Sequence, residues 1–539
     1  MSNETAKSQS IAIVPLLLLC LIQFGTMFDN AMLANSLSSI TVSFHTSLAK
    51  IQMANMVYPL LCASVMIISG FVGMNIGWKK ILIIGLAVIC AGELIAFASP
   101  DFAVFTYGGR VLAGIGGGIC IPGVLGYITA NFTKKNQALA FGAIAAIAAV
   151  GSAVAPVISG FIIVFSNWKI GFLLLGVLFL ILLVGGLFFL KGNIVKNEKT
   201  HFDYIGAILL FIGVSLFLFG LSIISSWGLI TPTAAPFTVL DMSPSLFVIG
   251  LGLVFIIICI YYEHSKEKKL TSIYVLLPKE FLQNREIRSG ILMSAFVFLT
   301  LGALNFVLVL YMQTVLDKNA IITGLYLTVF AAGMSITSLF TSAVAQSFSP
   351  KSICQFGIIL TAFACGFILF GIVKQDVNGL FYIGLFLIGL GCGLVASQAS
   401  FAVTSAIDDN NLASKSSGIQ GASRNFGQAI GVAIVGLVIM FGLAQSVKDQ
   451  ILTNDKLSSN LKSHINLMPN IPFVSNNQLS KEMNKAHIKN EQKQALLAIN
   501  EKARLIALRS SFIVMILFCM VFFFFSFGVI SKKISELKT

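Results

Sequence analysis

The sequence predicts an all-α membrane protein with fourteen helices that cross the bilayer. Hydrophobic residues make up 57% of its 539 positions and charged residues only 10%, and the mean hydropathy is +0.93. Apolar runs of about 20 residues, each long enough to cross roughly 30 Å of hydrocarbon, recur along the chain. Because a soluble globule of this composition would expose much of its apolar surface, a polytopic membrane protein is expected.

The apolar runs give the expected spans and their grouping. They cover residues 11–35, 51–73, 81–99, 102–130, 137–164, 170–190, 204–225, 245–262, 290–313, 321–346, 352–373, 379–405, 417–443 and 510–531. Charged linkers follow the sixth and the eighth run, at 191–201 and 263–288. They predict a six-helix bundle over 1–200, a two-helix insert with its linker over 201–289, and a second six-helix bundle over 290–539.

The basic residues predict how the chain is oriented. The formal net charge is +14, and lysines gather in the short loops on the side of both termini, at Lys79, Lys80, Lys134, Lys135 and Lys191 among others. By the positive-inside rule, both termini are expected in the cytoplasm, with the protein in the plasma (inner) membrane. The first span has no small-residue cleavage site and is expected to be retained. The charge therefore predicts orientation and attraction to anionic lipid, and no nucleic-acid partner.

Residue patterns typical of metal, cofactor or nucleotide sites are missing from the sequence. The nine cysteines have no Cys-x-x-Cys spacing, and the five histidines are scattered without ligand spacing. No Gly-rich loop is followed by Lys-Ser or Lys-Thr. We therefore expect no metal and no cofactor, and neither an ATP-driven pump nor another enzyme.

Ionisable side chains within the apolar runs are the first candidates for function, because a charge inside a membrane is costly. Asp29, Glu93 and Arg110 lie in spans 1, 3 and 4, each about 10–12 Å from the outer surface at 1.5 Å per residue. An apolar setting favours a protonated carboxyl group, and a nearby arginine favours an ionised one. A change of conformation could therefore make Asp29 or Glu93 bind and release a proton. The alternative is a static buried pair of Asp29 and Arg110 beside a purely structural Glu93.

A stripe of small residues marks the stretch 141–160, FGAIAAIAAVGSAVAPVISG. Gly151, Ala155 and Ser159 fall on one helical face, Gly160 closes the stretch, and Pro156 removes one backbone hydrogen bond. Such a helix lets another backbone approach closely and tends to kink. It is expected to serve as a hinge or sliding seam, or otherwise as a tightly packed helix with no part in motion.

Polar and small residues also line one face of spans 4 and 13. Arg110 heads a four-residue repeat of glycines, which predicts that it faces a neighbouring helix or a cavity and not lipid. Arg424 shares a face of span 13 with two glutamines near the cytoplasmic end. Gate or packing roles are expected for Gly114, Gly118, Gln420, Arg424, Gln428, Gly427 and Gly431.

Several of these stretches resemble motifs of one family, the major facilitator superfamily. The motifs are Asp29-Asn-Ala-Met-Leu-Ala-Asn35 in span 1, Arg110-Val-Leu-Ala-Gly114 in span 4, and 151–160 in span 5. Local sequences at 202–206, 227–228, 281–285, 311–313 and 417–433 are similar to its fourteen-span drug:proton antiporter branch. The resemblance implies a major facilitator fold of six, two and six helices, with proton coupling at Asp29. It also implies an antiporter hinge at Gly151, Ala155, Pro156, Ser159 and Gly160.

The expected function is thus proton-coupled export of amphiphilic small molecules by alternating access, as in multidrug efflux. The expected partners are a small-molecule substrate, protons and the lipid bilayer. The sequence does not indicate whether a periplasmic adaptor protein is a further partner. One alternative is dedicated export of a single metabolite, such as a siderophore or a peptide. Another is a non-transporting receptor or assembly subunit, because the stretch 70–79 lacks the acidic residue and the following arginine of the family motif.

A polar stretch at 445–509 separates spans 13 and 14 and lies outside the cytoplasm on the expected topology. Its many lysines do not contradict that topology, because long loops escape the charge rule. From 479 to 508 the composition favours a helix with an uneven amphipathic pattern. We expect this helix to cap the outer mouth of the protein, or to serve as a spacer with no role in transport.

Overall fold

The computed structural model describes residues 13–45, 48–192, 203–230, 237–267, 283–318, 320–345, 347–374, 377–407, 410–454, 473–485 and 490–531, with a few single positions between these ranges. Within them, fourteen helices are long and apolar enough to cross a membrane. This confirms the number of spans that the apolar runs predict.

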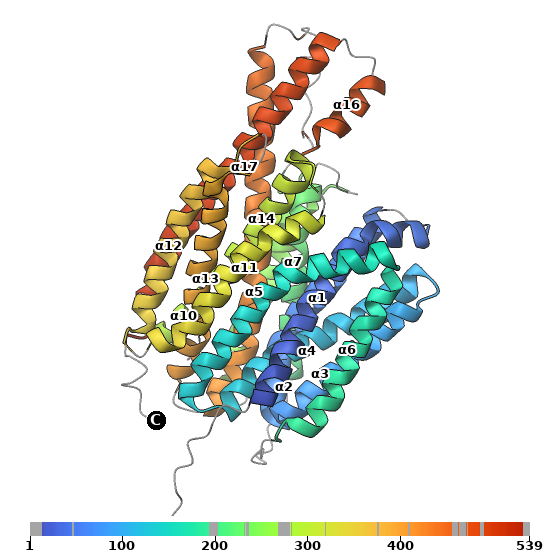
Figure 1. Ribbon diagram of the computed structural model, residues 1–539. Coiled ribbons are helices and arrows are strands. Elements are labelled where there is room, and N and C mark those ends of the chain that lie inside the picture. The colour runs from blue at the N-terminus through green and yellow to red at the C-terminus, as the bar shows by residue number, and fades with distance from the viewer. Residues whose placement is uncertain are drawn as a thin grey trace, which may run out of the picture.

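The helices follow one another in the order of the apolar runs (Figure 1). The first seven elements are α1 (Ile13–Ser43), α2 (Leu48–Ile76), α3 (Trp78–Ala98), the π-helical turn η1 (Val104–Arg110), α4 (Val111–Asn131), α5 (Lys134–Phe165) and α6 (Trp168–Phe189). Next come α7 (Tyr204–Trp227), α8 (Pro244–Glu267), α10 (Arg285–Val309), the π-helical turn η3 (Leu310–Val315) and α11 (Ala320–Val344). The last are α12 (Pro350–Gly371), α13 (Gly379–Ser405), α14 (Asn410–Leu452), α16 (Asn476–Lys485) and α17 (Asn490–Ser526).

Polar side chains fix where several spans begin. The side-chain oxygens of Asn167, Asp203, Asn284, Ser349 and Asn378 accept backbone N–H groups in the first turns of α6, α7, α10, α12 and α13. These N–H groups have no partner within their own helix, so each cap stabilises a helix start by about 1 kcal/mol.

The spans pack in two groups of six. In the first group α3 packs on α4 and α6, α2 packs on α4, and α1 packs on α5 and α6. In the second, α13 packs on α11 and α12, and α14 packs on α10 and α17. The pair α7 and α8 pack on each other, and α7 also touches α2 and α14. Two large hydrophobic cores follow this grouping, except that the core of the second group includes Ala145 and Ala149 of α5 and the core of the first includes Phe401 of α13.

The two ends of the bundle differ. We call the end where α1 begins and α17 ends the terminal end, and the opposite end, beyond which α14 and α17 project, the distal end (Figure 1). The two groups touch mainly through α5 with α11 and α13, and through α14 with α2 and α4. Near the terminal end, Gly142 lies against the Ser338 carbonyl and Gly418 against the backbone of Met66. The terminal ends of the two groups are therefore closed on one another.

The turn between α2 and α3 is built around an aromatic ring in place of the missing charges. Gly77 has a φ of 94°, a left-handed conformation that favours glycine. The following Trp78 is buried, and its ring packs against Gly73 and Gly126 so closely that neither position has room for a side chain. The loop that lacks the family's acidic residue and arginine is thus held by apolar packing.

The polar stretch before the last span differs in part from its predicted form. The structure has a short α16 over 476–485, and α17 begins at Asn490 and continues without a break into the last span. The predicted single helix over 479–508 is therefore two helices, and α14 extends nine residues past its apolar run to Leu452. Buried Arg504 ties this distal part together, because it donates to the Thr314 carbonyl at 2.6 Å and to Asn476 Oδ1 at 2.8 Å.

Candidate functional site: a buried charge cluster and an unpaired arginine

The structure brings the three intramembrane charges of the first group into one cluster. Arg110 Nη2 lies 2.7 Å from Asp29 Oδ1, and Arg110 Nη1 lies 3.3 Å from Glu93 Oε1. All three side chains are 0% exposed. One guanidinium from the start of α4 therefore joins carboxylates of α1 and α3.

Aromatic rings enclose the guanidinium of this cluster. Arg110 Cζ lies 5.0 Å from the ring centroid of Tyr58 on α2 and 5.4 Å from that of Phe172 on α6. Both rings are buried. A desolvated cation gains from the negative face of an aromatic ring. The sequence reasoning missed Tyr58 and Phe172, because each lies in an apolar run with no motif to mark it.

Close helix packing carries Arg110 to its partners. A Cβ atom on Gly114 would lie 2.9 Å from the Tyr58 carbonyl, and one on Gly118 would lie 2.5 Å from the Cys62 carbonyl. The glycine repeat thus lets α4 touch the backbone of α2, as small-residue stripes do in membranes. The π-helical turn η1 ends at Arg110 itself, and such turns re-aim side chains where they interrupt an α-helix.

The charges of this cluster do not balance if both carboxyl groups are ionised. Two carboxylates against one guanidinium leave one excess negative charge in a site without solvent access. An unneutralised charge in such a setting is costly, and one bound proton would remove it. Arg110 pairs with both carboxyl groups, and its contact with Asp29 is the shorter of the two. Glu93 Oε2 and Asp29 Oδ2 both lack a hydrogen-bond partner, so each carboxyl group has an oxygen free to hold the proton.

The small-residue stripe of α5 faces both groups of helices. Gly151 lies beside Met27 of α1, and Gly160 lies beside Ile321 of α11. Asn35 of α1 donates to Ser159 Oγ at 2.7 Å and to the Pro156 carbonyl at 2.9 Å. Ala155 is fully buried between these contacts. Helix α5 runs unbroken through Pro156, from Lys134 to Phe165.

The polar residues predicted to share one face of span 13 differ in their burial. Gln420 and Arg424 are buried, whereas Gln428, one turn further along, is exposed. Arg424 Nη2 donates to Ser400 Oγ of α13 at 3.2 Å, and its Cζ lies 5.2 Å from the ring centroid of Phe298 on α10. Gly427 and Gly431 pack directly against backbone carbonyls of α10, so they are close-contact positions.

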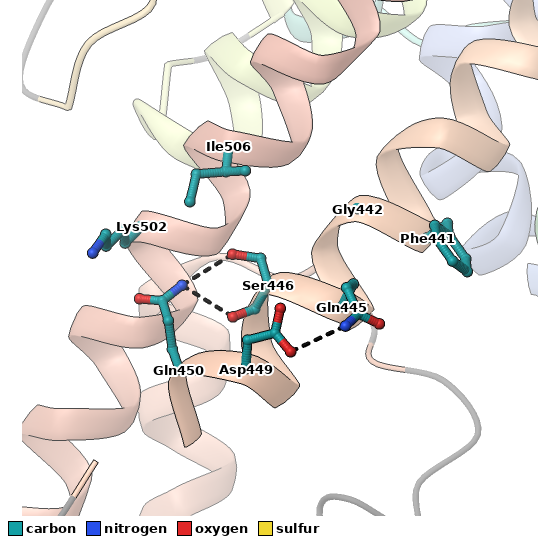
Figure 2. A pocket seen from close by; sticks show the side chains of 8 residues that line it. All are labelled: Phe441, Gly442, Gln445, Ser446, Asp449, Gln450, Lys502 and Ile506. Atoms are coloured by element: carbon teal, nitrogen blue, oxygen red, sulfur yellow. Dashed lines mark hydrogen bonds between the residues drawn. The ribbon is translucent and has the colours of Figure 1, made fainter. Parts of the chain in front are cut away.

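A groove of about 460 Å³ lies away from both arginines, on the distal projection (Figure 2). It runs between α14 and α17, and its lining includes Phe441, Asp449 and Lys502. Gln445 donates to Asp449 Oδ1 at 3.0 Å, and Gln450 donates to Ser446, so several of its polar groups pair within α14. It shares no residue with the charge cluster or with the contacts of Arg424.

Comparison with protein families identifies the architecture. A model described as Major Facilitator Superfamily matches residues 19–265 and 290–447. The crystal structure of the human organic anion transporter MFSD10 (TETRAN) has a TM-score of 0.55 and 11% sequence identity, and covers 80% of this chain and 94% of that chain. This similarity supports the fold alone.

Similar sequences include exporters. The chain is 24% identical to the tetracenomycin C resistance and export protein of Streptomyces glaucescens, over 76% of this chain and 73% of that protein. It is 23% identical to the multidrug resistance protein B homolog of Mycobacterium tuberculosis, over 71% of this chain and 68% of that protein. Its match to the uncharacterized MFS-type transporter YhcA of Bacillus subtilis, 23% identical, covers 63% of this chain and 60% of that protein.

Proposed function

The chain belongs to the major facilitator superfamily, and we propose that it is a proton-coupled exporter of amphiphilic small molecules. The observation that carries the proposal is the cluster of Asp29, Glu93 and Arg110, which has one uncompensated negative charge and no solvent access. Such a site is neutral with one proton bound and charged without it. A conformational change that admits water would let the proton leave, and closure would favour its return.

The exchange is proposed to follow alternating access. The two groups of helices rock about the seam of α5 with α11 and of α2 with α14, and the present conformation has its terminal ends closed. Gly151, Ala155, Pro156, Ser159 and Gly160 form the sliding part of this seam. A proton that crosses a membrane potential of about 100 mV releases about 2.3 kcal/mol. This free energy supports a concentration ratio of substrate of roughly tens-fold across the membrane.

The orientation proposed with this function places the terminal end in the cytoplasm and the distal end outside, in the plasma (inner) membrane. Lysines in the short loops of the terminal side support it, Lys79 and Lys191 among them. Substrate would then enter when the terminal ends separate, and protons would enter the cluster from the distal side.

A second candidate is dedicated export of one metabolite by the same mechanism. It is favoured by the relative from Streptomyces glaucescens, whose name gives a single compound, tetracenomycin C. The relative named multidrug resistance protein B homolog favours export of a broad range of substrates. The breadth of substrates that purified protein moves separates the two.

The test is transport by the full-length protein in proteoliposomes, with a panel of fluorescent amphiphiles and an imposed pH gradient. Export predicts uphill movement of at least one dye that stops when a protonophore collapses the gradient. It also predicts movement of protons in the opposite direction, reported by a pH-sensitive dye. Dye movement that is indifferent to the pH gradient, or its complete absence, would contradict the proposal and favour a receptor on a transporter fold.

A further inference from the structure

We propose that Arg424 binds an anionic group of the transported molecule, a carboxylate or a phosphate, so that the preferred substrates are acidic or zwitterionic amphiphiles. The inference rests on the proposed export function and names its substrate class. It starts from a difference between the two arginines of the membrane core. Arg110 has two carboxylate partners. Arg424 takes part in none of the ion pairs found among the described residues.

The surroundings of Arg424 leave its charge uncompensated. The residue is only 7% exposed, and its one side-chain hydrogen bond within the described part of the chain goes to the neutral hydroxyl of Ser400. Its Nε has no hydrogen-bond partner. A ring such as that of Phe298 stabilises a cation but removes none of its charge. A buried cation without a counter-ion is costly, so such a residue is expected to have an anionic partner at some stage of its function.

Arg424 lies next to residues at which the two groups of helices meet. Its neighbour Asn425 donates to Met66 Sδ of α2 at 3.4 Å, and Gly421 lies beside Met66 and Pro122 of α4. These contacts join the two groups of helices near the terminal end. When that end opens, the seam separates and the guanidinium faces the entry path. Closure then buries it again beside Ser400.

The chemistry of the two sites favours an anionic substrate group over a cationic one. The carboxylates that would attract a cation are already held by Arg110, and the guanidinium that would attract an anion is free of carboxylates among the described residues. Arginine binds carboxylate and phosphate through two parallel N–H donors, and here Nε is available.

The experiment uses rhodamine B, which has a free carboxylate, and its ethyl ester, which lacks that negative charge. Binding of both dyes to full-length protein in lipid nanodiscs is measured by fluorescence anisotropy against empty nanodiscs. Wild type is expected to bind the acid about tenfold more tightly than the ester or better. Arg424→Gln should reduce acid binding to the level of the ester, and Arg424→Lys should keep part of the preference. The control is Arg509→Gln, at an arginine that donates to the Ile372 carbonyl at the distal end.

A second variant tests the same inference while Arg424 stays in place. Ser400→Asp places a carboxylate within reach of the guanidinium, so it should supply an internal counter-ion and abolish the acid preference in a folded protein. The inference is overturned if wild type shows no acid preference, if it binds neither dye, or if Arg424→Gln and Ser400→Asp retain the preference. Proton-driven flux of the ester in proteoliposomes is measured in parallel. An Arg424-dependent acid preference without any proton-driven flux would refute the export proposal and leave the anion site in place.

Discussion

At the residue scale, the cluster around Arg110 behaves as one unit because its charge is shared. Removing either carboxyl group leaves one acid and one base, which neutralise each other without a proton. In the proposed mechanism Asp29 and Glu93 are therefore equally necessary for proton exchange, although only Asp29 matches a family motif. Motif matches alone would rank Asp29 above Glu93, and would leave Glu93 only the role of adjusting the electric field around Asp29.

The first prediction concerns the proton itself. Glu93→Gln and Asp29→Asn should each abolish uphill transport driven by a pH gradient, while downhill exchange of substrate continues. Infrared spectroscopy of the purified protein should show a protonated carboxyl band in wild type that is lost in both variants. The control is Glu263→Gln, at a buried carboxyl of α8 outside the cluster. Retention of uphill flux in either variant would return that residue to a structural role.

The second prediction concerns Tyr58, whose ring faces Arg110 and whose hydroxyl is buried without a hydrogen-bond partner. Tyr58→Phe keeps the ring and removes the hydroxyl, so protein level and thermal stability should change little. The pH dependence of transport should shift, because the buried charge cluster loses the dipole of the nearby Tyr58 hydroxyl. Phe179→Tyr, which adds a hydroxyl to another buried ring of the same core, controls for general effects of that group. An unchanged pH profile would show that Tyr58 only fills space.

At the element scale, α5 connects the two groups of helices, and its small residues are not equivalent. A Cβ on Gly142 would collide with the Ser338 carbonyl of α11, whereas a Cβ on Gly160 would lie 3.4 Å from Ile321, an ordinary contact. Of these two glycines, the one with less room for a side chain is therefore Gly142, at the terminal end. It lies outside the stretch 151–160 that matches the antiporter motif. Close contact between α5 and α11 is needed there to keep the terminal ends closed.

The third prediction follows from this difference. Gly142→Ala should reduce transport several-fold and increase labelling of cysteines introduced on the terminal side, because the closed seam loses about 1–3 kcal/mol to overpacking. Gly160→Ala, in the same helix, should change both properties much less, because the added methyl group would meet Ile321 at an ordinary contact distance of 3.4 Å. Equal behaviour of the two variants would contradict a specific role for the terminal seam.

The fourth prediction concerns the proline of the same helix. Pro156→Ala restores a backbone donor and stiffens α5, so turnover should fall while the amount of protein in the membrane stays the same. The Pro156 carbonyl that accepts Asn35 is kept in this variant, which leaves the contact with α1 in place. Parallel losses of protein and transport would assign Pro156 to folding and not to motion.

At the scale of the whole molecule, the distal projection is joined to the membrane core by specific hydrogen bonds. Arg504 of α17 donates to the Thr314 carbonyl at the end of η3, to the Val474 carbonyl and to Asn476 Oδ1. Lys374, beyond α12, pairs with Glu501 at 3.1 Å. The projection is thus anchored to the second group of helices and should move with it.

The fifth prediction tests this anchor. Arg504→Gln removes three hydrogen bonds from a charged donor, each worth about 1.5–3 kcal/mol at most. Trypsin cleavage at Lys481 on α16 should become faster by tenfold or more, whereas the infrared carboxyl band of the Asp29 cluster should not change. Lys502→Gln, on the groove of Figure 2, is the matched control and should leave cleavage unaffected. Unaltered cleavage in Arg504→Gln would mean that the projection is held by apolar packing.

The sequence by itself determined the number of spans, their order and the short list of charges inside them. It could do so because the hydrocarbon layer requires about 20 apolar residues per helix and internally satisfied backbones, and both demands are local. It also placed Asp29, Glu93 and Arg110 at one depth, because depth follows from the helical rise. The apolar runs do not mark the ends of helices that polar residues extend into water, as in α14 and α17.

Only the tertiary structure decided which of these residues meet. That Arg110 holds both carboxylates between Tyr58 and Phe172, while Arg424 lacks any carboxylate among the described residues, depends on how helices distant in sequence pack. In lipid that packing is set by the fit of small residues and by polar contacts between helices, since apolar surface alone does not discriminate one helix from another. The pattern of apolar runs does not contain this information, because every span satisfies the bilayer equally well whichever helix it packs against.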